Sequence, residues 1–177
     1  KKVFLKDGYS KTTIAQISEK ANVGYGTVYS HFKGKDDILG QVVDGVLDEF
    51  YALLNIEFTP ASIKEAKDIF YNIALSIFRL AEQHRHIMTV YQQALGHSEA
   101  ITAHWKGVQD FFTKNARISF TYSQENGLAR EFDPFIGSKA YILMVDRFIW
   151  EVVNEQVDDV EHLTKVLTDM VFHGFFI

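Results

Sequence analysis

The stretch TTIAQISEKANVGYGTVYSHF, residues 12–32, decides the fold. Its first half has helical spacing, because the apolar residues Ile14 and Ile17 recur three positions apart. Its second half again has helical spacing, with Val28 and Phe32 four positions apart, and the residues NVG separate the two halves. Two short helices joined by a tight turn predict a helix-turn-helix.

Three residues have the chemistry and spacing that this motif requires. The first helix needs a small residue where the second helix packs across it, and Ser18 meets this need. The turn needs a residue that tolerates a positive φ, and Asn22 is the best choice after glycine. Val28, six positions further on, supplies the apolar contact between the two helices. The motif is therefore complete in this stretch.

The glycines raise a second hypothesis, a loop that binds a nucleotide phosphate. The residues GYGTVY begin like the dinucleotide-binding fingerprint, but Tyr29 occupies the position of its third glycine, and a helix instead of a strand precedes it. A P-loop has four residues between its first glycine and Gly-Lys-Ser/Thr. Here seven residues separate Gly26 from Gly34, and an aspartate follows Lys35. Both nucleotide-binding hypotheses are disfavoured.

Charge is distributed unevenly along the chain. The 177 residues carry a net charge of −5, which by itself argues against nucleic acid as a partner. Residues 1–35 nevertheless hold seven lysines and two acidic residues, a net charge of +5, which leaves −10 for the remainder. A basic region on an acidic chain indicates a region that meets a polyanion, although chance clustering of surface lysines gives the same distribution.

The remaining sequence has helical apolar spacing and no alternating strand pattern, which predicts an all-α fold. We expect an N-terminal helix-turn-helix head in residues 1–50 and an antiparallel helical-bundle body in residues 51–177. Gly127 is placed to end a long helix, and Asp133 with Pro134 to begin the next one. Because the chain starts within a helical pattern, we expect the first helix to be truncated.

Composition and histidine spacing exclude several classes of site. The chain has no cysteine, which excludes disulfides and thiolate metal sites and fits a reducing cytoplasm. No apolar run approaches the ~18 residues of a membrane span, and no signal peptide opens the sequence. His84 and His86 do not share a helix face, and His97 and His104 are too far apart along a helix to chelate one ion. We expect a cytoplasmic protein that is not an enzyme and uses no metal, cofactor or membrane.

The longer stretch FLKDGYSKTTIAQISEKANVGYGTVYSHFKGKDDIL, residues 4–39, resembles the TetR family of bacterial transcriptional repressors. The matching features are the Gly-Tyr and Thr-Thr pairs, Ile-Ala, Gly-Thr-Val-Tyr, and Lys-x-Lys followed by an acidic pair. Two positions depart from the family pattern, because Asn22 replaces the usual turn glycine and Gly24 replaces the usual serine or threonine cap. The resemblance implies a homodimer that binds a palindromic DNA operator and an effector that binds the body.

The resemblance also implies that the second helix of the motif lies in the major groove, with its first residues at the base edges. Nearby polar and basic side chains are then candidates for base and phosphate contacts, although a tyrosine there could instead pack and a lysine could be solvated. The predicted DNA contacts are Thr13, Gly24, Tyr25, Gly26, Thr27, Tyr29, His31, Lys33 and Lys35. The head contains no arginine, so we expect readout by tyrosine, threonine and DNA shape.

Aromatic residues on helices that resemble the effector-binding helices of the family suggest an apolar cavity, although an ordinary aromatic core has the same composition. The predicted cavity residues are Phe78, Tyr91, Trp105, Gln109, Phe112, Tyr141, Met144 and Phe148. Few charges lie on these helix faces, so we expect a neutral or amphipathic ligand.

The stretch YILMVDRFIWEVV, residues 141–153, is apolar around most of its circumference. This suits a helix buried against its own body and a partner, or alternatively the central helix of a monomer. The predicted dimer-interface residues are Val145, Ile149, Val152, Leu163, Leu167 and Met170. The leading hypothesis is a repressor released from its operator by a small hydrophobic or amphipathic effector. The alternative is a helical lipid- or cofactor-binding protein without a DNA function.

Overall fold

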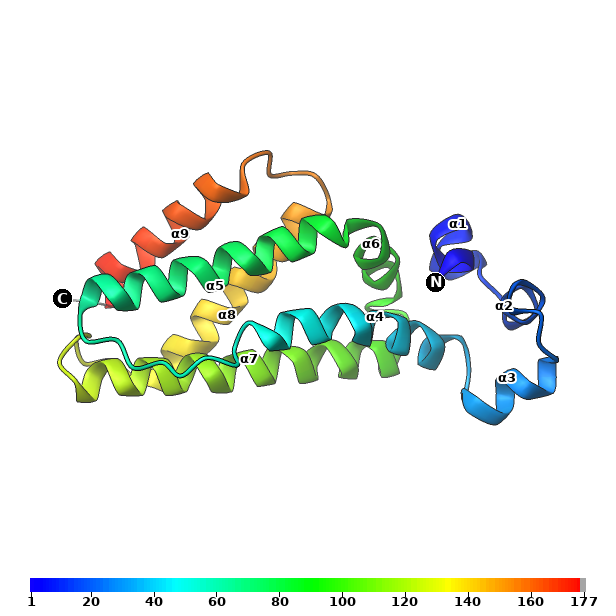
Figure 1. Cartoon of the computed structure of the whole chain (residues 1–177), viewed down its shortest axis with the longest axis horizontal. Helices are drawn as coiled ribbons and strands as arrows, with labels where there is room; N and C mark the ends of the chain where they lie inside the picture. The colour runs from blue at the N-terminus through cyan, green and yellow to red at the C-terminus, as the bar shows by residue number, and fades with distance from the viewer. Residues whose placement is uncertain (176–177) are drawn as a thin grey trace. The chain divides into compact units, whose positions relative to one another are not determined.

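The computed structural model describes residues 1–175, and Figure 1 shows that its regular structure is helical. No β-strand occurs within the described residues, so the predicted all-α fold is confirmed. Within the same residues, no helix has the length and apolar character needed to cross a bilayer. The helices are α1 (Lys2–Lys11), α2 (Ile14–Ala21), α3 (Tyr25–His31), α4 (Lys35–Ala52), α5 (Ile63–Gln83), α6 (Arg85–Ala94), α7 (Glu99–Glu125), α8 (Pro134–Val153) and α9 (Val160–Phe175).

The helices form two compact units. The first unit contains residues 1–49 and 84–107, and the second contains residues 50–83 and the chain from residue 108 onward. Helix α6 belongs to the first unit because it packs against α1, where the Tyr9 backbone N–H donates to Gln93 Oε1 at 3.1 Å. The sequence-based boundary at residue 50 assigns α6 to the body instead, because linear order does not reveal that α6 returns to the N-terminal helices.

Helix α1 is interrupted at Gly8, which has φ +73° and ψ 178°. A positive φ is unfavourable for a residue with a Cβ, so glycine allows the chain to change direction here. The helix resumes after Gly8 and continues to Lys11. Phe4 before the break and Tyr9 after it are both buried, so each half of α1 contributes to the core of the first unit.

The second unit is organised around α5, which packs against both α8 and α9 (Figure 1). An aromatic cluster lies at its core, where the Phe70 ring is 5.6 Å from Phe120 and 5.7 Å from Phe172, centroid to centroid. Aromatic pairs of this kind add about 0.5–1.5 kcal/mol to the stability gained from burial. Ring packing therefore contributes strongly to the stability of this unit.

The connection between α7 and α8 follows two predictions from the sequence. Gly127 follows the end of α7 with φ +68°, and Asp133 caps α8 by accepting hydrogen bonds from backbone N–H groups of its first turn. Gly137 permits a close approach that the sequence does not reveal, because a Cβ there would lie 2.5 Å from the Phe132 ring. These features fix the start of α8, the helix that carries Tyr141.

Candidate DNA interface and ligand cavity

Helix α2 begins with a complete capping box. The Thr13 hydroxyl accepts from the Gln16 backbone N–H at 3.3 Å, and Gln16 Oε1 accepts from the Thr13 backbone N–H at 2.8 Å. This arrangement satisfies backbone donors that a helix start otherwise leaves unpaired. Thr13 is exposed, but its hydroxyl is also within 3.0 Å of Gln16 Oε1, so a phosphate contact would compete with the cap.

The turn between α2 and α3 has the predicted geometry. Asn22 adopts the left-handed conformation, with φ 54° and ψ 44°, and its N–H donates to the Glu19 carbonyl at 3.1 Å. Ser18 and Val28 are each 5% exposed, as expected for the residues that bring the two helices together. Gly24 is the residue before the first turn of α3. The helix-turn-helix predicted from the sequence is confirmed.

The exposed face of α3 carries a pair of tyrosines. Tyr25 and Tyr29 are 54% and 49% exposed, and their ring centroids lie 5.1 Å apart. Their hydroxyl oxygens are 3.4 Å apart, and this hydrogen bond raises the pKa of Tyr29 above its ordinary value. Gly26 lies between them in the sequence, with open space around the position of a Cβ. The pair forms a protruding surface of rings and hydroxyls that suits base edges and phosphates.

Most predicted DNA contacts are accessible. Those that are exposed are Thr13, Gly24, Tyr25, Gly26, Thr27, Tyr29, His31 and Lys33. Lys35 is only half-exposed, because its Nζ donates to the Tyr9 carbonyl at 2.9 Å and lies 4.2 Å from the centre of the Tyr9 ring. This cation–π contact and hydrogen bond hold the ammonium group of Lys35 against α1.

Tyr9 also belongs to a hydrogen-bond network that the sequence analysis missed. The Tyr9 hydroxyl donates to Asp36 Oδ1 at 2.6 Å, and the Ser98 hydroxyl donates to Asp36 Oδ2 at 2.6 Å. Burial, followed by the hydrogen bond to Asp36, raises the pKa of Tyr9 to about 12. The network joins α1 to the start of α4, directly after the predicted DNA contacts. The sequence did contain a signal for this network, because Tyr9 belongs to the Gly-Tyr pair and Asp36 to the acidic pair of the family pattern.

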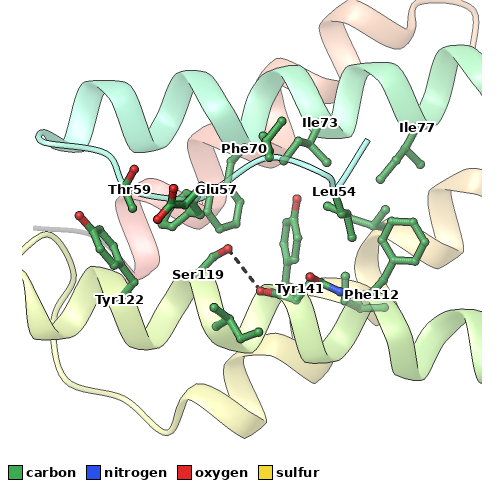
Figure 2. Close-up of a pocket in the computed structure, with 17 residues that line it drawn as sticks. Leu54, Glu57, Thr59, Phe70, Ile73, Ile77, Phe112, Ser119, Tyr122 and Tyr141 are labelled. Carbon is green, nitrogen blue, oxygen red and sulfur yellow. Dashed lines mark hydrogen bonds between the residues drawn. The ribbon is translucent and has the colours of Figure 1, made fainter. Parts of the chain in front are cut away.

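The second unit contains a cavity of about 390 Å³, shown in Figure 2. Small-molecule sites typically have volumes of about 300–1,000 Å³ and mainly apolar walls. The walls come from α5, α7, α8 and the segment 54–59, which follows α4. The residues that the three helices contribute include Phe70, Ile73, Ile77, Phe112, Ala116, Ser119, Tyr141, Ile142 and Val145. The cavity therefore suits a small, mostly apolar molecule.

The structure separates the residues that the sequence analysis assigned to the cavity. Phe112 and Tyr141 both line it. Tyr91 and Trp105 lie in the first unit instead, where both are buried with their rings 6.0 Å apart. Phe78, Gln109, Met144 and Phe148 belong to the second unit but are not among the lining residues. Helical spacing predicts which face of a helix is buried, but it does not show which helices meet.

The contributions of α5 and of the segment 54–59 were missed. Ile73 and Ile77 have the spacing of an inward helix face, which signals burial but not a cavity. The segment 54–59 has no periodic pattern, so nothing in the sequence marks it as a wall.

Two histidines of the first unit, His84 and His104, contact carboxylates. His84 Nε2 lies 2.9 Å from Glu49 Oε1, and His104 Nε2 lies 2.9 Å from Asp44 Oδ1. His104 Nδ1 is also within 2.8 Å of the Tyr91 hydroxyl. Across residues 1–175, no group of three or more His, Cys, Asp or Glu side chains is arranged to hold a metal ion.

Comparisons with known proteins agree with this geometry. Residues 1–42 match the family described as bacterial regulatory proteins, tetR family. YhgD of Bacillus subtilis (strain 168), an uncharacterized HTH-type transcriptional regulator, is 24% identical over 168 residues, which cover 89% of this chain and 83% of that protein. SmeT, the repressor of the Stenotrophomonas maltophilia multidrug efflux pump SmeDEF, has a TM-score of 0.75 at 18% identity, over 99% of this chain and 85% of that one. NalD, the secondary repressor of the MexAB-OprM multidrug efflux pump in Pseudomonas aeruginosa, has a TM-score of 0.72 at 21% identity. That match covers 99% of this chain and 90% of NalD.

Residues 1–42 of this chain thus match the tetR family of bacterial regulatory proteins, and the chain as a whole is similar to HTH-type transcriptional regulators. The family match lies over α1, α2, α3 and the first part of α4, so it assigns the helix-turn-helix to DNA binding. The likeness to SmeT and NalD extends over nearly the whole chain and concerns the fold.

TetR-family regulators bind DNA as dimers, and the residues predicted for the dimer interface have different environments here. Those buried within the chain are Val145, Ile149, Val152 and Leu167. Leu163 is half-buried, whereas Met170 is 59% exposed. Other apolar residues of the same helices are also exposed, namely Phe135 (46%), Ile136 and Leu143 (both 63%) of α8 and Val166 (41%) of α9. The exposed apolar surface of these two helices thus differs from the predicted set, except at Met170.

Proposed function

We propose that this TetR-family regulator represses transcription in the bacterial cytoplasm as a homodimer on a palindromic operator, and that a small hydrophobic or amphipathic effector releases it. The observation that carries the proposal is the presence, in one chain, of an exposed Tyr25–Tyr29 surface on the second helix of a helix-turn-helix and an apolar cavity of about 390 Å³. SmeT, which shares the fold, has been solved as a complex with triclosan.

The exposed side chains support specific roles on DNA. In this proposal Tyr25 and Thr27, in the first turn of α3, meet base edges in the major groove. Lys33 follows α3 with its side chain exposed and meets a phosphate. Gly26 leaves space for the helix to approach the bases closely, since a Cβ there would contact nothing else in the chain.

The effector acts by linkage between the two binding events. A ligand that prefers the conformation with low operator affinity weakens DNA binding by the ratio of its affinities for the two conformations, typically about 5- to 150-fold. The cavity wall includes the segment 54–59, which directly follows α4, and α4 itself begins two residues after Lys33. Helix α4 is therefore the covalent connection through which a change at the cavity would reach the DNA contacts.

The DNA-binding part of the proposal is tested with an operator selected from random duplexes by the full chain. The double variant Tyr25→Ala/Thr27→Ala should lower operator affinity by about 10- to 100-fold, because each lost base contact costs about 1–3 kcal/mol. Fluorescence anisotropy gives the affinity, and circular dichroism checks that the variant is folded. A folded double variant with unchanged operator affinity would contradict the assignment.

A matched pair of lysine variants tests the phosphate contact. Lys33→Ala should reduce the slope of log affinity against log salt concentration by about 1. Lys64→Ala, which alters an exposed lysine of the second unit, should leave that slope unchanged. If the wild-type chain fails to bind duplex DNA even at low salt, the alternative of a helical lipid- or cofactor-binding protein is favoured.

We propose that the exposed apolar surface of α8 and α9 forms the dimer interface, with Ile136, Leu143, Val166 and Met170 covered by the second copy. Leu143→Glu should convert the dimer to a monomer at micromolar concentration, because a carboxylate buried without a partner is costly. Leu5→Glu is the matched control, since Leu5 is exposed in the first unit. Analytical ultracentrifugation distinguishes the two variants, and a Leu143→Glu chain that remains dimeric would place the interface elsewhere.

A further inference from the structure

The cavity of the second unit has almost no charge on its walls. Among the described residues that line it, Glu57 is the one charged side chain, and it is exposed. No lysine, arginine or histidine is present in that lining set. An anionic group held inside the cavity would lose its hydration without gaining a cationic partner, which is strongly unfavourable. The walls therefore discriminate against anions.

Tyr141 provides a polar group in the wall of the cavity. Its side chain reaches inward from α8, and Figure 2 shows its hydroxyl directed away from the backbone of α8, toward α5. The ring is held between neighbours, with centroids 5.5 Å from Phe70 and 6.0 Å from Phe120. Within residues 1–175, no hydrogen bond to the Tyr141 hydroxyl is formed. Burial raises the pKa of Tyr141, so the hydroxyl remains a proton donor throughout the physiological range.

The other polar groups of the lining are already paired or lie near solvent. The Ser119 hydroxyl donates to the Asn115 carbonyl at 3.3 Å, the dashed line in Figure 2. The Asn115 side-chain amide donates to the Phe111 carbonyl at 2.9 Å. Thr59 is exposed. Tyr122 also lines the cavity, and Figure 2 shows its hydroxyl at the end of the lining near Thr59, on the far side of Ser119 from Tyr141. Tyr141 is thus the available donor at its own end of the cavity, and an unpaired hydroxyl in apolar surroundings favours a ligand that supplies an acceptor.

We propose that the cavity selects an uncharged, largely apolar molecule whose oxygen or nitrogen acceptor takes a hydrogen bond from the Tyr141 hydroxyl. The effector role of that molecule rests on the function proposed above, but the binding preference does not. The cavity accordingly prefers ketones, ethers, esters or neutral phenols over carboxylates of the same shape. Tyr141 is the residue that determines this specificity.

Three aromatic probes of similar size test the proposal on the full chain. Biphenyl lacks an acceptor, 4-acetylbiphenyl has an uncharged one, and biphenyl-4-carboxylate has nearly the same shape as the ketone but is ionised at about pH 7.5. Dissociation constants come from competition with Nile red, an uncharged fluorescent dye. The ketone should bind most tightly, and the carboxylate should bind at least about tenfold more weakly than the ketone.

Tyrosine variants separate the hydroxyl from the shape of the cavity. Tyr141→Phe should lower the affinity for the ketone by about 3- to 10-fold, the usual effect of losing one hydrogen bond. The affinity for biphenyl should change by less than about twofold. Tyr122→Phe is the matched control, because Tyr122 also lines the cavity, and its ketone affinity should equal that of the wild type. Ala116→Leu fills space in the cavity and should weaken all three probes. Thermal denaturation verifies that each variant is folded.

Several outcomes would overturn the proposal. They are a carboxylate that binds as tightly as the ketone, a Tyr141→Phe variant that weakens all probes equally, and a wild-type chain that binds none of them. The same probes are then added to the operator complex. If they bind with the expected preference but leave operator affinity unchanged, the specificity of the cavity stands and the effector function fails. If operator binding itself is absent, only the DNA-binding function fails.

Discussion

The two units of this chain are stabilised by different kinds of contact. In the first unit, Tyr9 of α1 and Ser98, which precedes α7, both donate short hydrogen bonds to the carboxylate of Asp36. In the second unit, aromatic rings pack around Phe70, and the Tyr141 hydroxyl forms no hydrogen bond within the described residues. Directional bonds fix the relative positions of helices, whereas ring packing tolerates rearrangement. The first arrangement suits DNA readout, and the second suits a cavity that accepts a ligand.

The largest expected effect is the loss of a ring from the aromatic core. Phe120→Ala should lower the free energy of unfolding by about 3–5 kcal/mol, since Phe120 is fully buried and contacts several rings. Urea denaturation followed by circular dichroism measures this change. A loss below about 1 kcal/mol would show that neighbouring rings refill the space. That outcome would weaken the view that the second unit depends on close ring packing.

The next effect concerns the carboxylate of the first unit. Asp36→Ala removes the acceptor of two hydrogen bonds of 2.6 Å and should lower the free energy of unfolding by about 2–3 kcal/mol. Operator affinity should also fall, because the start of α4 is no longer held against α1. Asp37→Ala is the matched control, since that carboxylate accepts one bond of 3.0 Å from the exposed Lys33 N–H, and it should cost less than about 1 kcal/mol. Equal losses in the two variants would argue against a special role for the Asp36 network.

A smaller effect is expected at alkaline pH. The pKa of Tyr9 is raised to about 12 in the folded chain by burial and by its bond to Asp36, above its usual value of about 10. The unfolded chain therefore releases this proton first as the pH rises, so stability should fall between about pH 10 and pH 12. Burial of Tyr141 acts in the same direction. Denaturation midpoints are measured against pH for the wild type, Tyr9→Phe and Tyr141→Phe. As the pH rises, the midpoint should fall less steeply in each variant than in the wild type. Equal slopes in all three proteins would refute the assignment.

The helix-turn-helix could be predicted because its determinants are local. Ser18, Asn22 and Val28 lie within eleven consecutive residues. Ser18 is small enough for close helix packing, Asn22 tolerates the left-handed conformation, and Val28 is apolar and buried. The Asp133 cap and Gly127 are local in the same sense. Neighbours in sequence determine these features directly.

The cavity and the network depend on contacts between distant segments. Tyr91 and Phe112 have similar apolar surroundings in the sequence, but the first packs beside Trp105 in the first unit and the second lines the cavity. Likewise, Ser98 is 62 residues from the Asp36 that accepts its hydrogen bond. Helical periodicity cannot indicate which of many buried faces will meet. The aromatic composition predicted that a cavity exists, but not its walls.

The smallest effect tests the turn that the sequence predicted best. Asn22→Ala should lower the free energy of unfolding by about 1 kcal/mol, because alanine is strained in the left-handed conformation, while Asn22→Gly should stay within about 0.5 kcal/mol of the wild type. Gly96→Ala is the control, since Gly96 has φ +79° in the same unit with open space around it. Both alanine variants should be destabilised to a similar extent. Only Asn22→Ala should also weaken operator binding, because only that turn sets the angle between α2 and α3. Equal operator affinities in the two variants would show that the turn does not affect DNA readout.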